Sequence, residues 1–259
     1  MAALDVRGAS AAPYGPPLLA GIDFSLAPGE ILSVLGPNGA GKSTLLHALA
    51  GGIDTAEGEI RLGGQPLAQW PRLARARALA MLPQQSTLAF PFRVEEVILL
   101  GRSPHASGAA EDRVVLAEVM RATDTERLRH RLYTHLSGGE RQRVQLARVL
   151  AQLWRAADSD TRVLLLDEPT TGLDLEHQDL VMASLRQLAA TGCAVVMVAH
   201  DFNLAAAMAQ RVLVLRNGRQ VCQGAPAEVF TGRMFEEVFR VQVHIATHPL
   251  SGAPLVVHP

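Results

Sequence analysis

The chain of 259 residues has little cysteine and few aromatic residues. Cys193 and Cys222 are the only two cysteines, too few for a disulfide scaffold and consistent with a reducing compartment. Aromatic residues make up 4% of the chain, so a core must be built mainly from Leu, Val and Ala. Hydrophobic residues reach 48%, which is enough for a sizeable core.

The sequence also lacks long hydrophobic runs and an excess of charge. No stretch approaches the roughly 20 apolar residues that a membrane-spanning helix needs. The N-terminus has no basic segment followed by an apolar run, so no signal peptide is visible. We therefore expect a cytosolic protein, and any membrane role would come through partners. The net charge of −1, without a long basic stretch, argues against nucleic acid as a partner.

Lysine is nearly absent, because Lys42 is the only one beside 23 arginines. This bias is typical of a GC-rich genome, which favours arginine codons. The one lysine therefore marks a place that needs a compact ammonium on a flexible stem and not a planar guanidinium.

Short apolar runs rich in Val, Ile and Leu alternate with helix-like stretches such as Ser43 to Ala50 and Asp174 to Ala190. This alternation predicts an α/β fold with a largely parallel sheet covered by helices. The runs expected to form buried strands are Ile31 to Leu35, Val163 to Leu166, Ala194 to Ala199 and Val212 to Leu215. An antiparallel flank is expected from Leu4 to Val6, Ile22 to Leu26 and Glu59 to Leu62.

The middle of the chain differs from its two ends. From about Val94 to Leu153 the pattern is helical, with no convincing strand. We expect one domain over residues 1–259. Its α/β core is discontinuous, at 1–85 and 158–241, and a helical subdomain at 86–157 is inserted into it. A C-terminal extension at 242–259 follows.

A glycine-rich segment lies between an expected strand and an expected helix. Glycines let the backbone curl so that successive N–H groups point at phosphate oxygens, and the next helix adds its positive end. Lys42 can then reach the β- and γ-phosphates, and the Ser43 hydroxyl can bind Mg²⁺. The alternative, an incidental glycine-rich turn, is disfavoured by the strand–loop–helix setting. The segment comprises Gly36, Pro37, Asn38, Gly39, Ala40, Gly41, Lys42 and Ser43.

Two carboxylates and one histidine follow expected strands. Asp167 ends a buried strand, where it can hold Mg²⁺ through a bound water, and Glu168 can act as the general base on the attacking water. His200 ends another strand and could contact the γ-phosphate, because parallel strands present their carboxyl ends at one edge. Solvated acids and a structural histidine are the common alternative when such residues occur alone.

The segment Leu136-Ser137-Gly138-Gly139-Glu140 precedes an expected helix from Arg141 to Leu153. A serine with two glycines at a helix start makes a second anion-binding cradle, and an ordinary N-cap is the alternative. A chain with one phosphate loop and a second, separate cradle suggests that the second serves the nucleotide of another copy.

Together these motifs resemble those of ATP-binding cassette ATPases, and the resemblance covers nearly the whole chain. It rests on the phosphate loop from Gly36 to Thr44, the signature from Leu136 to Glu140, and the carboxylates Asp167 and Glu168, in the family's order. The resemblance implies a P-loop NTPase core with an antiparallel β flank and an inserted α-helical subdomain. It also implies that two copies sandwich two ATP molecules, each bound by one copy's phosphate loop and the other's signature.

The same resemblance implies roles for three further residues. Tyr14 would stack on adenine, although a tyrosine beside Gly15 and Pro16 is also an ordinary turn residue. Gln84 would sense the γ-phosphate and Mg²⁺ and join the core to the helical subdomain. Asp174 closes the segment Thr171-Gly172-Leu173-Asp174, which resembles the loop that communicates across the dimer.

A narrower resemblance concerns the cargo. The segments Leu88 to Phe92 and Gly101 to His105 look like those of importers of iron chelates, cobalamin and hemin. Ala151-Gln152-Leu153-Trp154 with the extended loop after it, and His248 to Val256, are similar to the hemin-importing branch. The departures are Thr171-Gly172, where that branch often has Ser-Ala, and Gln85, where it often has His.

The resemblance implies an ATP-hydrolysing subunit that powers hemin import. It would act as a homodimer with two transmembrane permease subunits and a periplasmic heme-binding protein, at the cytoplasmic face of the bacterial inner membrane. An importer of siderophores or cobalamin is the alternative within the class. A soluble cassette ATPase outside transport is disfavoured by the lack of a coiled-coil insert or basic arm. A phosphotransferase would leave Ser137 and His200 without a function.

Overall fold

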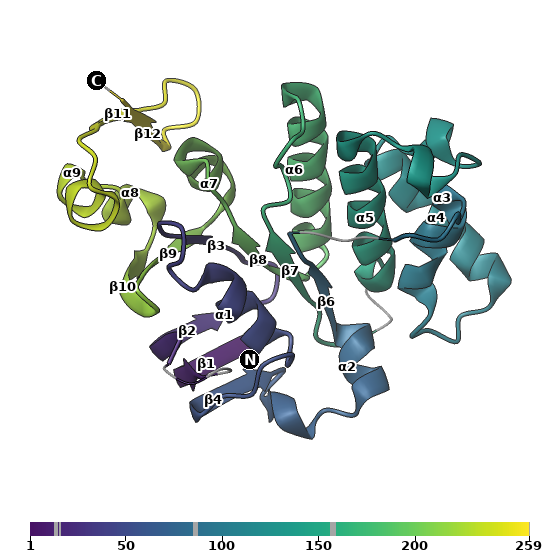
Figure 1. The fold of residues 1–259 in the computed structure, drawn as a ribbon, viewed down its shortest axis with the longest axis horizontal. Coiled ribbons are helices and arrows are strands. Elements are labelled where there is room, and N and C mark those ends of the chain that lie inside the picture. Colours follow the sequence, from purple (N-terminus) through teal and green to yellow (C-terminus); the bar gives the residue numbers. More distant parts are fainter. Residues whose placement is uncertain (13–14, 16, 85–87, 156–158, 259) are drawn as a thin grey trace.

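A ten-stranded sheet organises the protein, in the order β5-β4-β1-β2-β10-β9-β3-β8-β7-β6 (Figure 1). The structure is a computed structural model that describes residues 1–12, 15, 17–84, 88–155 and 159–258. Five neighbouring strands of the sheet run parallel. These are β3 (Ile31–Leu35), β6 (Leu79–Leu82), β7 (Val163–Asp167), β8 (Ala194–Val198) and β9 (Arg211–Arg216).

The other half of the sheet is mainly antiparallel. In it β1 pairs with β2 and β4, β4 pairs with β5, and β10 pairs with β9. A single parallel pairing between Arg219 and Ala20 joins β10 to β2. The antiparallel pairing of β10 with β9 connects this half to the parallel strands. The bounds are β1 (Leu4–Ala11), β2 (Leu19–Leu26), β4 (Glu57–Leu62), β5 (Gln65–Pro66) and β10 (Arg219–Gly224).

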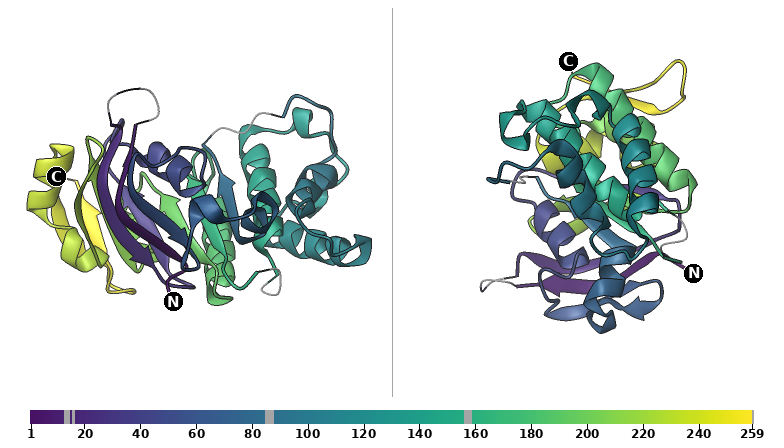
Figure 2. Two further views of the ribbon diagram at one scale, coloured as in Figure 1. Left: turned by 90° about the horizontal axis from the view of Figure 1, so that it is seen from below. Right: turned by 90° about the vertical axis from the view of Figure 1, so that its right-hand side faces the viewer.

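Helices cover both faces of the sheet. The helices near the core strands are α1 (Lys42–Leu49), α2 (Arg72–Ala78), α6 (Leu175–Ala190) and α7 (Phe202–Met208). Between β6 and β7 the chain forms α3 (Val94–Leu99), α4 (Ala109–Ala122) and α5 (Gly138–Leu153). Short 3₁₀ turns lie at Leu67–Gln69, Leu100–Arg102, Glu126–Leu128 and Tyr133–His135. Figure 2 shows α3, α4 and α5 at one end of the molecule and the C-terminal segment at the other.

The C-terminal segment begins with α8 (Pro226–Val229) and α9 (Gly232–Met234), and a single π-helical turn follows at Phe235–Phe239. It ends in a separate two-stranded hairpin of β11 (His244–Thr247) and β12 (Pro254–Val257). None of the helices in the described part of the chain is long and apolar enough to cross a membrane.

Side chains of the central strands divide between two hydrophobic cores, as the two-residue period of a strand requires. Ile31 and Leu35 of β3 belong to the core that includes α3 to α7, whereas Leu32 and Val34 belong to the core with α1 and the antiparallel flank. All of these side chains are almost completely buried. A strand buried on both faces is continuously apolar, which explains why these runs are visible in the sequence.

The expected fold class is confirmed: an α/β P-loop core, an antiparallel flank and an inserted helical region. The four expected central strands form, with ends shifted by one residue at most. Several elements were not expected, among them β5, β6, β10, α2 and the terminal hairpin. The strand β6 is only four residues long and follows an Arg- and Ala-rich helix, so its period is too short to recognise.

Candidate functional site

The glycine-rich loop connects β3 to α1 and curls tightly at its start. A Cβ atom at Gly36 would lie 2.3 Å from the Leu215 carbonyl oxygen, so only glycine fits there. At Gly39 and Gly41 the φ angles are 76° and 98°, which lie in the left-handed region that favours glycine. The loop therefore has the curled backbone that a phosphate cradle requires, and α1 begins directly after it.

The Lys42 ammonium lies inside this loop. Its Nζ donates to the carbonyl oxygens of Gly36, at 2.8 Å, and Pro37, at 3.1 Å, and the residue is 7% exposed. Burial lowers the pKa of Lys42, and the charges of Glu168 and Asp167 act in the opposite direction. The only lysine of the chain is thus held in the loop, facing two carboxylates.

Asp167, the last residue of β7, is 2% exposed. Burial raises the pKa of Asp167, although the Ser43 hydroxyl lowers it by hydrogen bonding and Lys42 by its charge. The Oδ1 atom is the single buried side-chain polar atom without a hydrogen-bond partner in the described part of the chain. A carboxylate with one unsatisfied oxygen, beside a serine hydroxyl, fits a hard divalent cation, which prefers oxygen ligands.

Glu168 adopts a conformation that is rare for a residue with a side chain. Its φ angle is 54°, and its backbone N–H donates to the Val198 carbonyl oxygen of the neighbouring strand at 3.2 Å. One carboxylate oxygen lies 2.5 Å from His200 Nε2, and the other accepts from the Thr171 hydroxyl at 3.2 Å. Such backbone strain is typical of functional sites, because surrounding contacts must maintain it.

His200 follows β8 and lies at the same edge of the sheet as Glu168. Its side chain is 50% exposed, whereas that of Glu168 is 11% exposed. A hollow of about 280 Å³ connects this histidine to the phosphate loop. It is lined by Gly36, Pro37, Asn38, Ala199, His200, Phe202 and Phe239. The structure thus brings the loop, both carboxylates and the histidine together, as the sequence predicts.

Two further candidate residues, Gln84 and Tyr14, come from the family resemblance. Gln84 is exposed and lies two residues after β6. Because β6 runs parallel to β7, with Leu82 opposite Leu166, Gln84 leaves the sheet at the edge where Asp167 lies. Tyr14 lies outside the described residues, and its adenine-stacking role stays a prediction.

The signature segment caps α5. The Ser137 Oγ accepts from the Glu140 N–H at 3.3 Å, and Glu140 Oε2 accepts from the Ser137 N–H at 2.8 Å, which is a reciprocal capping box. Ser137 and Gly138 are exposed at the N-terminal end of this 16-residue helix. The ordinary N-cap is therefore present, and the start of the helix is open to solvent; its anion-binding role stays a prediction.

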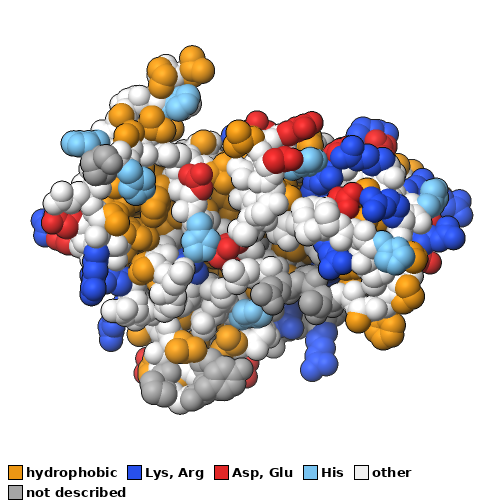
Figure 3. All heavy atoms as spheres, turned by 45° about the horizontal axis from the view of Figure 1, so that its top comes forward, with side chains coloured by type: hydrophobic (Ala, Val, Ile, Leu, Met, Phe, Trp, Pro, Cys, Tyr) orange, Lys and Arg blue, Asp and Glu red, His pale blue; other side chains and the backbone are white. Residues whose placement is uncertain are grey.

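Beside this helix start lies an open hollow of about 540 Å³, the signature cleft. Basic side chains surround it, and Figure 3 shows blue side chains gathered over the helical region of this face. Arg131 pairs with Glu140 at 2.9 Å on its rim. The residues that line it are Arg127, Arg131, His135, Ser137, Gly139, Glu140, Arg143, Gly172, Leu173, Asp174 and His177.

Asp174 belongs to the signature cleft and not to the phosphate loop of its own chain. It caps α6 by accepting from the His177 N–H at 3.0 Å, and its Oδ1 lies 2.5 Å from His177 Nδ1. The backbone and ring hydrogen bonds from His177 hold the pKa of Asp174 below its ordinary value. His177 is a neighbour that sequence reasoning missed, since only its i+3 spacing from Asp174 indicates the contact.

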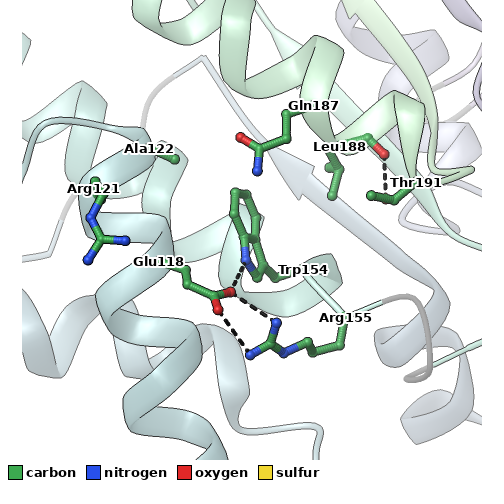
Figure 4. Close-up of a pocket in the computed structure, with 8 residues that line it drawn as sticks. All are labelled: Glu118, Arg121, Ala122, Trp154, Arg155, Gln187, Leu188 and Thr191. Carbon is green, nitrogen blue, oxygen red and sulfur yellow. Dashed lines mark hydrogen bonds and ion pairs between the residues drawn. The ribbon is translucent and has the colours of Figure 1, made fainter.

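A further hollow of about 450 Å³ lies at the seam between the helical region and the core (Figure 4). The indole N–H of Trp154 donates to Glu118 of α4 at 2.6 Å, and Arg155 pairs with the same carboxylate at 3.0 Å. Gln187 and Leu188 of α6 form the opposite wall. The motif that ends in Trp154 therefore joins α5 to α4 beside the core.

The fold and this site define a P-loop nucleoside triphosphatase with a signature-type helix start. Residues 19–171 match the family model described as ABC transporter. The chain belongs to the ABC transporter family.

Two curated relatives are named hemin import ATP-binding protein HmuV. One, from Gloeobacter violaceus, is 50% identical over 242 residues, which cover 93% of this chain and 88% of the relative. The other, from Myxococcus xanthus, is 49% identical over 256 residues, which cover 98% of this chain and 96% of the relative.

Solved structures with the same fold carry matching descriptions. The ATP-binding subunit of an ABC transporter is 25% identical with a TM-score of 0.78, covering 87% of this chain and 91% of that chain. A dimeric ATP-binding cassette bound to ADP and phosphate, in a post-hydrolysis state, is 25% identical with a TM-score of 0.75. That match covers 86% of this chain and 98% of the neighbour.

Proposed function

We propose that this chain is the ATP-hydrolysing subunit of a hemin importer, and that it drives a transmembrane permease. The observation that carries the cargo assignment is the identity of 49–50%, over 93% or more of the chain, to relatives named hemin import ATP-binding proteins. The observation that supports hydrolysis is the convergence of Lys42, Asp167 and Glu168 beside the phosphate loop.

ATP binds through its phosphates to the loop from Gly36 to Thr44. The curled backbone offers N–H groups to the phosphate oxygens, and Lys42 exchanges its two carbonyl partners for the β- and γ-phosphates. This exchange leaves the ammonium hydrogen-bonded in both states. The buried Lys42 charge also becomes better compensated when the anion enters.

Mg²⁺ is the cation that fits the Ser43 and Asp167 oxygens, with Gln84 as a further ligand at the same sheet edge. Among the described residues no group of three or more His, Cys, Asp or Glu side chains could hold a metal ion. This agrees with Mg²⁺, which is usually bound by one or two protein oxygens together with phosphates and waters. When bound, the ion neutralises charge that develops on the phosphates.

Glu168 acts as the general base for the attacking water. His200 and Thr171 hold its two carboxylate oxygens, so the side chain is oriented before the nucleotide binds. The γ-phosphate lies within reach of His200, which links the base to the nucleotide. Because His200 is the more exposed member of the pair, it is the one available to a ligand in the hollow.

The signature cleft serves the nucleotide of a second copy in a head-to-tail homodimer. Ser137, Gly138 and Gly139 offer the helix start, and Glu140 preserves it through the capping box. Asp174 lies in the same cleft and contacts the partner's phosphate-loop region across the dimer. Two exposed arginines in the lining of the cleft, Arg127 and Arg131, suit an anionic nucleotide.

Two permease subunits contact the helical region, at the cytoplasmic face of the bacterial inner membrane. Phe90 and Phe92 support this contact, because they are 69% and 38% exposed and their ring centroids lie 6.1 Å apart. Exposed aromatic rings of this kind mark interaction surfaces. A periplasmic heme-binding protein supplies the cargo from the other side.

The test is purification of this chain with its permease, followed by reconstitution in vesicles with ATP and hemin, cobalamin or a ferric siderophore. ATP-dependent movement of hemin, and of neither other cargo, is the expected result. Movement of cobalamin or siderophore alone would reassign the cargo but retain the transport class. If no polytopic membrane protein copurifies, a soluble cassette ATPase becomes the better assignment. The control replaces ATP with a non-hydrolysable analogue.

A further inference from the structure

The helix that follows His200 is held on two sides by the C-terminal segment. Figure 1 shows the terminal hairpin beside α7, and β12 and α7 are in contact. His200 itself lies in the short link between β8 and α7, outside both elements. The orientation of its backbone therefore depends on where α7 begins.

The first contact is between Asn203 and the hairpin. The Asn203 side chain donates to the Val256 carbonyl oxygen at 3.2 Å and accepts from the Val256 N–H at 2.7 Å. One amide group thus satisfies both backbone groups of a single residue of β12. Val256 is 6% exposed and belongs to the large core, so packing holds the hairpin at this residue. Among side chains of this length only asparagine offers both a donor and an acceptor.

The second contact is aromatic. The ring of Phe202 meets those of Phe235 and Phe239 edge-on, with centroids 4.8 and 4.9 Å apart. Both partners belong to the π-helical turn that leads to the hairpin. Phe202 and Phe239 also line the hollow that contains His200 and the phosphate loop.

The hydrogen bonds of α7 connect these contacts to His200. Asp201 caps the helix by accepting from the N–H groups of Asn203, at 2.8 Å, and Leu204, at 3.0 Å. Asn203, which the hairpin holds, is therefore hydrogen-bonded to Asp201, the immediate neighbour of His200. A shift of Asn203 would move the cap and, with it, the imidazole that lies 2.5 Å from Glu168.

We infer that the C-terminal hairpin positions His200 for ATP hydrolysis, and that Asn203 is the positioning residue through which it acts. This inference rests on the proposed role of His200 at the γ-phosphate. It assigns a function to residues 242–259, which no nucleotide-binding motif includes. The hairpin acts on the histidine and not on the phosphate loop, so it affects turnover and not nucleotide binding.

The experiment compares Asn203→Leu and Asn203→Asp with the unaltered protein in the permease complex. Leucine has a similar volume but removes both hydrogen bonds, so kcat for ATP hydrolysis should fall about 10-fold with less than about a twofold change in KM. Aspartate retains the acceptor for the Val256 N–H and loses the donor, so its kcat should be intermediate. The matched control is Ser251→Ala, which alters the hairpin turn away from α7 and should leave kcat unchanged.

Amide hydrogen exchange supplies the second readout. The amides of α7 (Phe202–Met208) should exchange faster in Asn203→Leu, and those of α1 should be unchanged. A kcat within about twofold of the unaltered value, or a parallel loss of kcat and ATP affinity, would overturn the inference. His200→Ala distinguishes a failure of the proposed role of His200 from a failure of the hairpin inference. If this variant hydrolyses ATP normally, the proposed role of His200 fails. If it is inactive while Asn203→Leu is active, only the hairpin inference fails.

Discussion

The phosphate-loop region and the signature cleft are built in opposite ways. In the first, Lys42 is 7% exposed and Asp167 is 2% exposed, and both are held by neighbours within the same chain. In the second, Ser137 and Gly138 are exposed at the start of α5, beside an open hollow of about 540 Å³. The chemical groups are thus preorganised inside one chain, whereas the second cradle is left accessible. This difference is what a site shared between two copies requires.

Replacement of the base should have the largest effect. Glu168→Gln keeps the size of the side chain but removes its ability to take a proton, so hydrolysis should fall about 1000-fold while ATP still binds. Size-exclusion chromatography with ATP should then show an accumulated dimer. The control is Glu176→Gln, an exposed residue in the first turn of α6. Normal turnover in Glu168→Gln would remove Glu168 as the base.

Mixed dimers test whether the two regions act in trans. Ser137→Arg places bulk and charge in the signature cleft, and Lys42→Ala removes the phosphate-binding cation, so each homodimer should be inactive. Heterodimers purified through two different tags contain one intact site of two and should recover about half of the normal rate. Lys42→Ala paired with Glu168→Gln is the control, because both changes affect the phosphate-loop region and leave no intact site. Equal activity of the two heterodimers would contradict sharing between copies.

Replacement of Asp167 tests how much its buried carboxylate destabilises the folded protein. Burial raises its pKa in the folded protein above the unfolded value, so the ionised form disfavours folding. This cost is fully present above the folded-state pKa and disappears as the pH falls below the unfolded pKa. Asp167→Asn should therefore raise the melting temperature of the nucleotide-free protein at neutral pH by about 2–4 °C. The difference in melting temperature between the variant and the unaltered protein should become smaller in acid. ATP hydrolysis by the variant should be lost. A lower melting temperature for the variant would refute this explanation.

Arg131 should show the smallest effect. Its side chain is 48% exposed and its pairing with Glu140 lies on the rim of the signature cleft, where an ion pair contributes little to stability. Arg131→Gln should shift the melting temperature by less than about 2 °C. The KM for ATP should rise about two- to threefold, because one cation of the cradle is lost. A loss of folding in this variant would show that the cleft is not simply an open surface.

Features encoded in contiguous segments are predictable from the sequence. The phosphate loop, the Ser137 cap and the apolar strands all depend on neighbours a few residues apart, through glycine conformations, capping spacing and periodicity. The order of Asp167 and Glu168 after a buried run likewise indicates a strand that delivers them to a sheet edge. These local signals explain why the fold class agrees with expectation and why the phosphate loop, Asp167 and Glu168 lie at one edge of the sheet.

Contacts between distant segments were not predictable in the same way. The short strand β6, the Trp154–Glu118 seam and the hairpin on α7 join residues separated by tens of positions. The strand β6 is too short to show a periodic pattern, and the other two contacts use ordinary polar residues. No local pattern in the sequence therefore indicates these contacts. The link between Asn203 and Val256 spans 53 residues and becomes visible only when the chain is folded.

The sequence by itself determined which groups are present and in what order: the loop ending in Lys42, the carboxylates, the histidine and the second cradle at Ser137. The tertiary structure decided how they meet. The left-handed conformation of Glu168 accompanies the hydrogen bond of its N–H to Val198 on the next strand. The contact with His200 depends on β7 and β8 being parallel neighbours. Long-range strand order and register set these distances, and neither is encoded in a local pattern.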